Sequence, residues 1–180
     1  MILQKMEAEY EVKHLPAQIK KWNSRYADAV EYVYENGLMN GTSSNAFSPN
    51  ANTTRGMIVT ILARVEGVNT NGTPWYAAGQ KWAMDNGISD GTNMPGVITR
   101  EQMATFLYRF AEKNGVDMSQ EAGLSGFEDA GKVSTFAKDA MAWAVANELI
   151  VGVTAKTLQP KGTATRAQVA TVIMRYAKTF

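Results

Sequence analysis

The dipeptide Thr-Arg occurs three times in this chain, and each time the residues that follow it have the same apolar spacing. Apolar side chains stand three, six, seven and ten positions after Arg55, Arg100 and Arg166, which places them on one face of an α-helix. They are Ile58, Ile61, Leu62 and Val65; Met103, Phe106, Leu107 and Phe110; and Val169, Val172, Ile173 and Tyr176. The pattern predicts three amphipathic helices, one in each copy of a repeated unit.

A second helix is expected before each Thr-Arg pair. Corresponding aromatic residues, each followed nine positions later by a glycine, mark it: Tyr32 with Gly41, Trp82 with Gly91, and Trp143 with Gly152. Gly37 and Gly87 suit the left-handed conformation that often ends a helix. The third unit has Glu148 at that position, so its helix is expected to end differently.

Each unit is therefore a helix, a loop and a second helix. A helix pair cannot bury its apolar face alone, so the three pairs are expected to pack together. The predicted fold is all-α, with three repeats at residues 22–68, 72–116 and 127–180. Residues 1–21 are expected to form a helical N-terminal extension, because apolar residues recur there at loosely helical spacing.

The loops between the glycine and the arginine differ in length. The first and third carry an apolar residue followed by a proline, Phe47 with Pro49 and Leu158 with Pro160. The second loop is five residues shorter and lacks this apolar residue.

Composition excludes several classes of function. Eighteen basic and 17 acidic residues leave a net charge of +1, which argues against a polybasic nucleic-acid or membrane-surface binder. The chain has no cysteine and a single histidine, so disulfides, thiolate metal sites and histidine clusters are excluded. No metal or other cofactor and no catalytic residue is expected. No apolar stretch approaches the length of about 20 residues that a membrane span needs, and the chain shows no signal peptide.

The Thr-Arg pairs are the best candidates for binding chemistry. Thr54, Thr99 and Thr165 are suited to cap the helices that follow them. Each arginine then stands at the positive end of a helix, which is unfavourable unless an anion lies nearby. One interpretation is that the three arginines receive a carboxylate or phosphate. The other is structural: each arginine caps carbonyls, or pairs with an acid of a neighbouring repeat. The candidate acids are Asp28, Asp85, Asp129 and Asp139.

The ordered series of motifs resembles the S-layer homology domain, a module that holds bacterial surface proteins on the cell wall. The motifs are the opening Phe127-Glu128-Asp129, the turns Gly37-Leu38-Met39-Asn40-Gly41 and Gly87-Ile88-Ser89-Asp90-Gly91, the loop Phe47-Ser48-Pro49, and the three Thr-Arg pairs. The resemblance covers the chain from about Trp22 to Phe180.

The resemblance implies a pseudo-threefold unit with a central three-helix bundle and three prongs. Grooves between the prongs would bind an anionic secondary cell-wall polysaccharide, commonly a pyruvylated one. The ligand-binding residues implied are Arg55, Arg100, Arg166, Thr54, Thr99, Thr165, Asp129, Trp22 and Trp75. The module would be non-catalytic, extracellular and monomeric, located at the bacterial cell wall or S-layer, with no nucleic-acid partner and no membrane insertion.

Departures from the family pattern keep an alternative open. The first two repeats lack a clear aromatic-x-Asp opening, and the acid that follows the Thr-Arg pair remains only as Glu101. The alternative is a protein–protein interaction or surface-assembly module that has kept the architecture without binding glycan. Its partners would be other surface proteins.

Overall fold

The computed structural model describes residues 26–180, and this part of the chain is all-helical. The α-helices are α1 (Ala27–Glu35), α2 (Arg55–Val65), α3 (Ala77–Asp85), α4 (Arg100–Lys113), α5 (Lys138–Ala146) and α6 (Arg166–Thr179). Short 3-10 helices occur at η3 (Leu124–Gly126), η4 (Ala130–Lys132) and η5 (Thr135–Ala137). The all-α prediction is confirmed. The predicted extension at residues 1–21, and Trp22, lie outside the described residues.

The helices α2, α4 and α6 begin at the arginines of the Thr-Arg pairs, as the sequence predicts. The preceding threonine is the N-cap in each, and its side chain accepts a backbone N–H three residues further on. In α4 and α6 a glutamine, Gln102 or Gln168, returns a bond to the N-cap backbone and completes a capping box. These local bonds fix where each helix starts.

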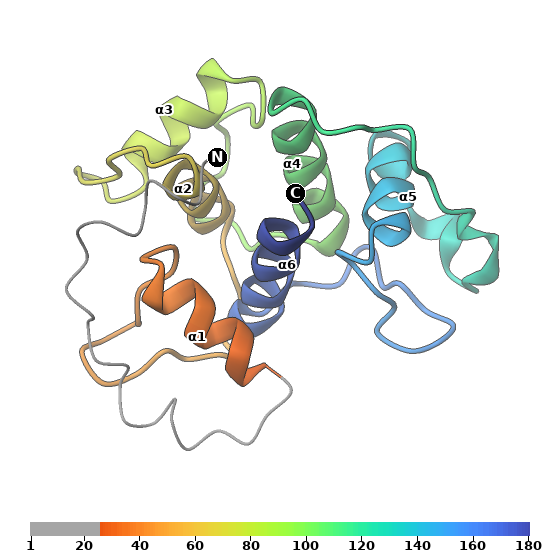
Figure 1. Cartoon of the computed structure of the whole chain (residues 1–180), viewed down its shortest axis with the longest axis horizontal. Helices are drawn as coiled ribbons and strands as arrows, with labels where there is room; N and C mark the ends of the chain where they lie inside the picture. Colours follow the sequence, from red (N-terminus) through yellow and green to blue (C-terminus); the bar gives the residue numbers. More distant parts are fainter. Residues whose placement is uncertain (1–25) are drawn as a thin grey trace.

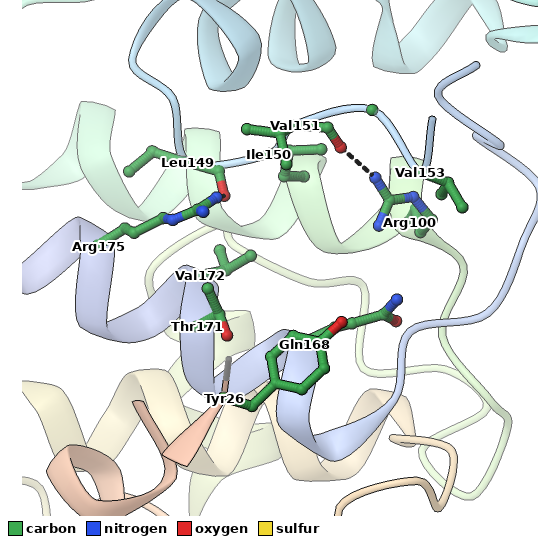
Figure 2. A pocket seen from close by; sticks show the side chains of 11 residues that line it. Tyr26, Arg100, Leu149, Ile150, Val151, Val153, Gln168, Thr171, Val172 and Arg175 are labelled. Atoms are coloured by element: carbon green, nitrogen blue, oxygen red, sulfur yellow. Dashed lines mark hydrogen bonds between the residues drawn. The ribbon is translucent and has the colours of Figure 1, made fainter. Parts of the chain in front are cut away.

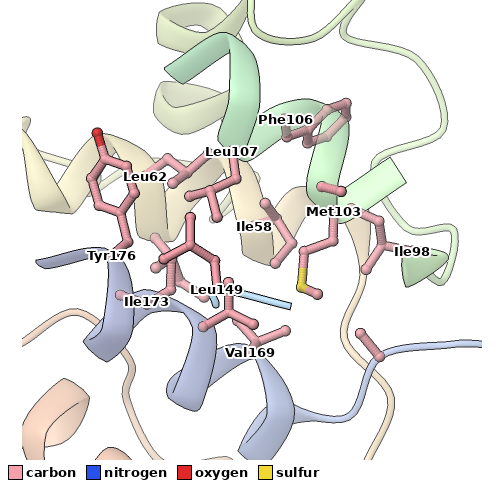
Figure 3. Close-up of a cluster of buried hydrophobic side chains, with 14 of the residues drawn as sticks. Ile58, Leu62, Ile98, Met103, Phe106, Leu107, Leu149, Val169, Ile173 and Tyr176 are labelled. Carbon is pink, nitrogen blue, oxygen red and sulfur yellow. The ribbon is translucent and has the colours of Figure 1, made fainter. Parts of the chain in front are cut away.

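The core lies where α2, α4 and α6 meet at the centre of the molecule (Figure 1). The apolar stripes predicted from the sequence face one another there (Figure 3). Buried members include Ile58 and Leu62 of α2, Met103 and Leu107 of α4, and Val169 and Ile173 of α6. Burial of these side chains, each worth about 1.5–3 kcal/mol, holds the three inner helices together.

The outer helices do not pack on the inner helix of their own predicted repeat. Instead α1 packs on α6, α3 on α2, and α5 on α4 (Figure 1). The approach of α3 to α2 is close, because a Cβ added at Gly79 would lie 2.8 Å from Thr60 Cα. Each outer helix therefore packs against the inner helix of a different predicted repeat, and these contacts link the three predicted repeats to one another.

The loops before the inner helices are joined in a cycle. Isolated β-bridges pair Asn52 with Thr165, Thr54 with Val97, and Thr99 with Thr163. The first N–H of each inner helix also donates to the loop of another predicted repeat: Arg55 to Gly96 O at 2.9 Å, Arg100 to Gly162 O at 2.8 Å, and Arg166 to Ala51 O at 2.9 Å. Helix starts that would otherwise have unpaired N–H groups are thus satisfied by neighbouring loops.

The expectation that α5 ends differently from α1 and α3 is wrong. Glu148 adopts φ of 56°, close to the values of 66° at Gly37 and 68° at Gly87. The next residue, Leu149, donates its N–H back to Ala144 O at 2.9 Å, as in the other two helix ends. Packing of the segment that follows Glu148 holds this residue in the left-handed conformation, even though that conformation is unfavourable for a residue with a side chain.

None of the described helices has the length and apolar character needed to span a bilayer.

Candidate ligand-binding cavities

Arg100 is almost fully buried and spans two predicted repeats. Its Nε donates to Leu158 O and its Nη2 donates to Val151 O, both at 2.8 Å. Figure 2 shows the bond to Val151. Burial lowers the pKa of Arg100, and the charge of Asp129 partly opposes that effect; an arginine stays cationic regardless. A guanidinium has five N–H groups, and these two bonds use two of them.

Arg166 makes the corresponding contacts with the loop that precedes α2. Its Nε donates to Phe47 O at 2.9 Å, and its Nη2 donates to Asn40 O at 2.5 Å. The guanidinium carbon lies 4.5 Å from the centroid of the Phe47 ring, which is a cation–π distance. Burial lowers the pKa of Arg166 as well. In the described structure its hydrogen-bond partners are neutral carbonyls.

Arg55 differs in one partner. Its Nε donates to Thr92 O at 3.0 Å, but its Nη2 donates to a carboxylate, Asp90 Oδ1, at 2.7 Å. The sequence position is the same, since Asp90 precedes Gly91 as Asn40 precedes Gly41 and Val151 precedes Gly152. Here the side chain replaces the backbone carbonyl as the acceptor.

The structural interpretation of the arginines therefore holds for part of each guanidinium, which caps loop carbonyls. The acids considered from the sequence are not the ion-pair partners: Asp85 pairs with Lys81, and Asp28 and Asp139 stand in the first turns of α1 and α5. Asp129 and the arginines form no ion pair in the described part of the chain. The acid that pairs is Asp90, which sequence reasoning missed.

A cavity of about 230 Å³, the Arg100 cavity, lies between α6 and the segment that follows α5. Figure 2 shows Arg100 at one side and Arg175 at the other, with the 149–153 segment above and α6 below. Arg175 Nη1 donates to Glu148 O at 3.1 Å, which holds its guanidinium beside the cavity. Tyr26 contributes from the start of α1. The remaining lining residues are Leu149, Ile150, Val151, Gly152, Val153, Gln168, Thr171 and Val172.

A second cavity of about 440 Å³, the Arg166 cavity, has corresponding walls. Arg166 and Arg64 line it, and Arg64 donates from Nε to Thr70 Oγ1 at 2.9 Å. Trp75, half exposed, stands at its edge. The remaining lining residues are Leu38, Met39, Asn40, Gly41, Thr42, Met57, Thr60 and Ile61.

The two cavities share one chemical character. Each is lined by two arginines and by apolar side chains, and no acidic residue is among the described residues of either lining. Arginine offers a planar fork of donors that matches a carboxylate or a phosphate. Arg100 and Arg166 are buried and donate to neutral carbonyls, and a guanidinium in such a position favours an anion nearby.

The other predicted site residues have more local roles in the structure. Thr54, Thr99 and Thr165 use their hydroxyls as helix caps. Asp129 accepts the N–H of Leu158 at Oδ1 and the N–H of Gln159 at Oδ2, both at 2.8 Å. These backbone bonds, that of Leu158 first, lower the pKa of Asp129. Because Leu158 O accepts from Arg100, the Asp129 carboxylate holds the segment that positions this arginine.

Two lining arginines, Arg64 and Arg175, were not predicted as site residues. The sequence did contain a signal for them, because an arginine stands one position before the last apolar residue of all three stripes, at Arg64, Arg109 and Arg175. That regularity marks a shared position in the fold, and the structure shows that in two cases the position faces a cavity.

Comparison with known proteins adds the family. Residues 19–56 and 126–170 match the S-layer homology domain. An endoglucanase of Bacillus sp. (strain KSM-635) is 31% identical over 172 residues, which cover 87% of this chain and 18% of that protein. The surface-layer 125 kDa protein of Lysinibacillus sphaericus is 28% identical over 179 residues, covering 88% of this chain and 15% of that protein. The S-layer protein of Bacillus thuringiensis subsp. finitimus is 27% identical over 171 residues, covering 85% and 20%.

The helical fold and the matched segments define a non-catalytic module for anchoring at the bacterial cell surface. The chain belongs to the S-layer homology family, as its motifs predict. It spans a fifth or less of the length of these relatives, so the similarity to the endoglucanase concerns only a small share of that enzyme.

Proposed function

We propose that this module anchors a surface protein by binding an anionic cell-wall polysaccharide, one that carries pyruvate ketals. The observation that supports the proposal is the pair of cavities, each lined by two arginines and by no acidic side chain among the described residues. A ketal carboxylate is a small, permanent anion at neutral pH. It matches the guanidinium fork in size and charge.

The sugar ring would contact the edge of the cavity. Trp75 is 50% exposed beside the Arg166 cavity. An indole this exposed offers a flat apolar face to the C–H groups of a sugar. In the Arg100 cavity Val151 and Val153 are half exposed and would take the corresponding apolar contact.

The repeats at residues 22–68, 72–116 and 127–180, arranged about a pseudo-threefold axis, belong to this proposal. The corresponding bonds of Arg55, Arg100 and Arg166 to three different loops support it. Two cavities on one module would let a single polymer strand engage twice, which raises avidity without a new contact. We propose that the module does this as a monomer, with no catalytic step.

The test is sedimentation with purified bacterial wall sacculi, before and after chemical removal of the secondary polymer. We expect the full chain to sediment with intact walls and to remain in solution after removal. The substitution Trp75→Ala should weaken sedimentation several-fold, because the half-exposed indole lines the cavity and its ring contact is an edge-to-face one with the neighbouring Tyr76.

Phe136→Ala is the matched control. Phe136 is an aromatic residue, 59% exposed, that stands two residues before α5 as Trp75 stands two residues before α3. We expect this variant to sediment like the unmodified chain. Failure of the unmodified chain to bind walls that carry pyruvylated polymer would overturn the proposal and favour the protein–protein alternative.

A further inference from the structure

The anion-binding character of the three arginine positions is unequal, and Asp90 makes the difference. Resting on the function proposed above, we infer that Asp90 closes the Arg55 position to anionic ligands, so that the module has two working glycan sites and not three. The second partner of each guanidinium is a carbonyl for Arg100 and Arg166 and a carboxylate for Arg55.

The Asp90 carboxylate is fixed beside the Arg55 guanidinium, where the other two arginines have a backbone carbonyl. Oδ1 accepts from Arg55 Nη2 at 2.7 Å and also from the N–H of Thr92 at 3.0 Å. The bond from Thr92, more than the charge of Arg55, lowers the pKa of Asp90, so the group stays ionised at neutral pH. A second anion at Arg55 would have to displace this internal one or stand beside a like charge.

The shape of the chain differs at the same place. After Asn40-Gly41 and after Val151-Gly152 the backbone makes a small hairpin, closed by the bridges Ser43–Ala46 and Thr154–Thr157. The hairpins begin with Thr42 and Val153, which line the two cavities. After Gly91 the loop is five residues shorter and passes directly to Thr92, whose carbonyl accepts from Arg55. The Arg55 position therefore lacks the wall that the hairpin supplies elsewhere.

Two independent differences, in charge and in loop length, thus separate the Arg55 position from the others. The charge difference depends on one side chain that is 64% exposed, so it can be changed without touching the core. The residue at the corresponding position of the Arg166 cavity is Asn40, which has the same size as aspartate without its charge. Its backbone carbonyl, which accepts from Arg166, stays in place when the side chain changes.

The experiment titrates the full chain with a methyl glycoside of a pyruvylated amino sugar. It records the stoichiometry by calorimetry and the Nε–Hε signals of the three arginines by NMR. The unmodified chain should bind two equivalents and shift the signals of Arg100 and Arg166 only. With Asp90→Asn, the Nε–Hε signal of Arg55 should also shift during the titration, and calorimetry should record a third bound equivalent or a weak third binding step. With Asn40→Asp, the Arg166 signal should no longer shift, and the chain should bind one equivalent.

Asp85→Asn is the charge-matched control, because Asp85 is an exposed acid of α3 that pairs with Lys81. It should leave two equivalents. Two outcomes would overturn the inference about Asp90 and leave the proposed function standing. One is a shift of the Arg55 signal in the unmodified chain, and the other is binding of only two equivalents by both Asp90→Asn and Asp90→Ala. No shift of Arg100 or Arg166 in the unmodified chain would overturn the proposed function and the inference together.

Discussion

Arg166 contacts Phe47 twice, through the ring and through the backbone. Its guanidinium carbon lies 4.5 Å from the ring centroid, and its Nε donates to the Phe47 carbonyl at 2.9 Å. The two residues are 119 positions apart in the chain. This contact joins the start of α6 to the loop before α2, so one side chain both closes the cycle of loops and lines a cavity.

This double role predicts the effect of changing Arg166. Arg166→Lys keeps the charge but loses the fork that reaches Phe47 O and Asn40 O together, so we expect a loss of about 1–3 kcal/mol in the free energy of unfolding. Arg166→Ala leaves both carbonyls without their donor and should cost about 2–5 kcal/mol. Urea denaturation followed by circular dichroism measures both.

Lys178→Ala provides the control for this series, since Lys178 is an exposed residue of the last turn of α6. A surface change of this kind should stay within about 0.5 kcal/mol. If Arg166→Lys were as stable as the control, the bonds to the loop would not contribute to stability. The arginine would then serve the cavity alone.

Glu148 supplies a second prediction, with the opposite sign. It holds a left-handed conformation, with φ of 56°, at the end of α5, where α1 and α3 have glycine. Glu148→Gly should therefore raise the free energy of unfolding by about 0.5–1 kcal/mol, since relief of the backbone strain exceeds the added freedom of the unfolded chain. Thermal denaturation should show a melting temperature higher by about 1–4 °C.

The reverse change at the corresponding position is Gly87→Ala. A Cβ there would meet nothing within 4 Å, so only the backbone conformation resists it, and we expect a loss of about 1 kcal/mol. Opposite shifts from the two variants would establish the backbone as the cause. A drop in stability for Glu148→Gly would show instead that the glutamate side chain contributes a contact that outweighs the strain.

Local features of the sequence were enough to predict the inner helices. A threonine cap and an apolar stripe act within one or two turns in all three inner helices, and α4 and α6 add a capping-box glutamine, so α2, α4 and α6 begin where the Thr-Arg pairs predict. Glu148 was misjudged because local preference disfavours a left-handed glutamate. The packing of Leu149 and Ile150 into the core imposes that conformation nonetheless.

The partners of the arginines could not be predicted in the same way. Which outer helix packs on which inner helix is decided by contacts between residues far apart in the chain, and these decide which loop reaches each guanidinium. Asp90 was overlooked because its nearness to Arg55 appears only once the loop after α3 is placed against the start of α2. The sequence alone indicated anion-binding arginines, and the structure shows which of them already has an anion.

The Asp129 carboxylate gives a prediction about pH. Its bonds to the N–H groups of Leu158 and Gln159 lower its pKa in the folded protein below the ordinary value of about 3.9. A group whose pKa is lowered by folding stabilises the fold above its unfolded pKa and loses that effect as the pH falls through its folded pKa. The contribution should therefore be constant near neutrality and disappear in acid, below about pH 4.

Comparison with Asp129→Asn isolates this contribution. An amide has one acceptor oxygen where the carboxylate has two, so the variant leaves one of the two N–H groups without its bond. At pH 7 the variant should be less stable than the unmodified chain, and the two should converge as the pH is lowered below about 4. Glu31→Gln, on the exposed side of α1, should track the unmodified chain's curve at neutral pH. A gap between Asp129→Asn and the unmodified chain that persisted unchanged in acid would mean that the carboxylate charge does not hold this loop. Arg100 would then owe its place to Val151 and to its own bond with Leu158.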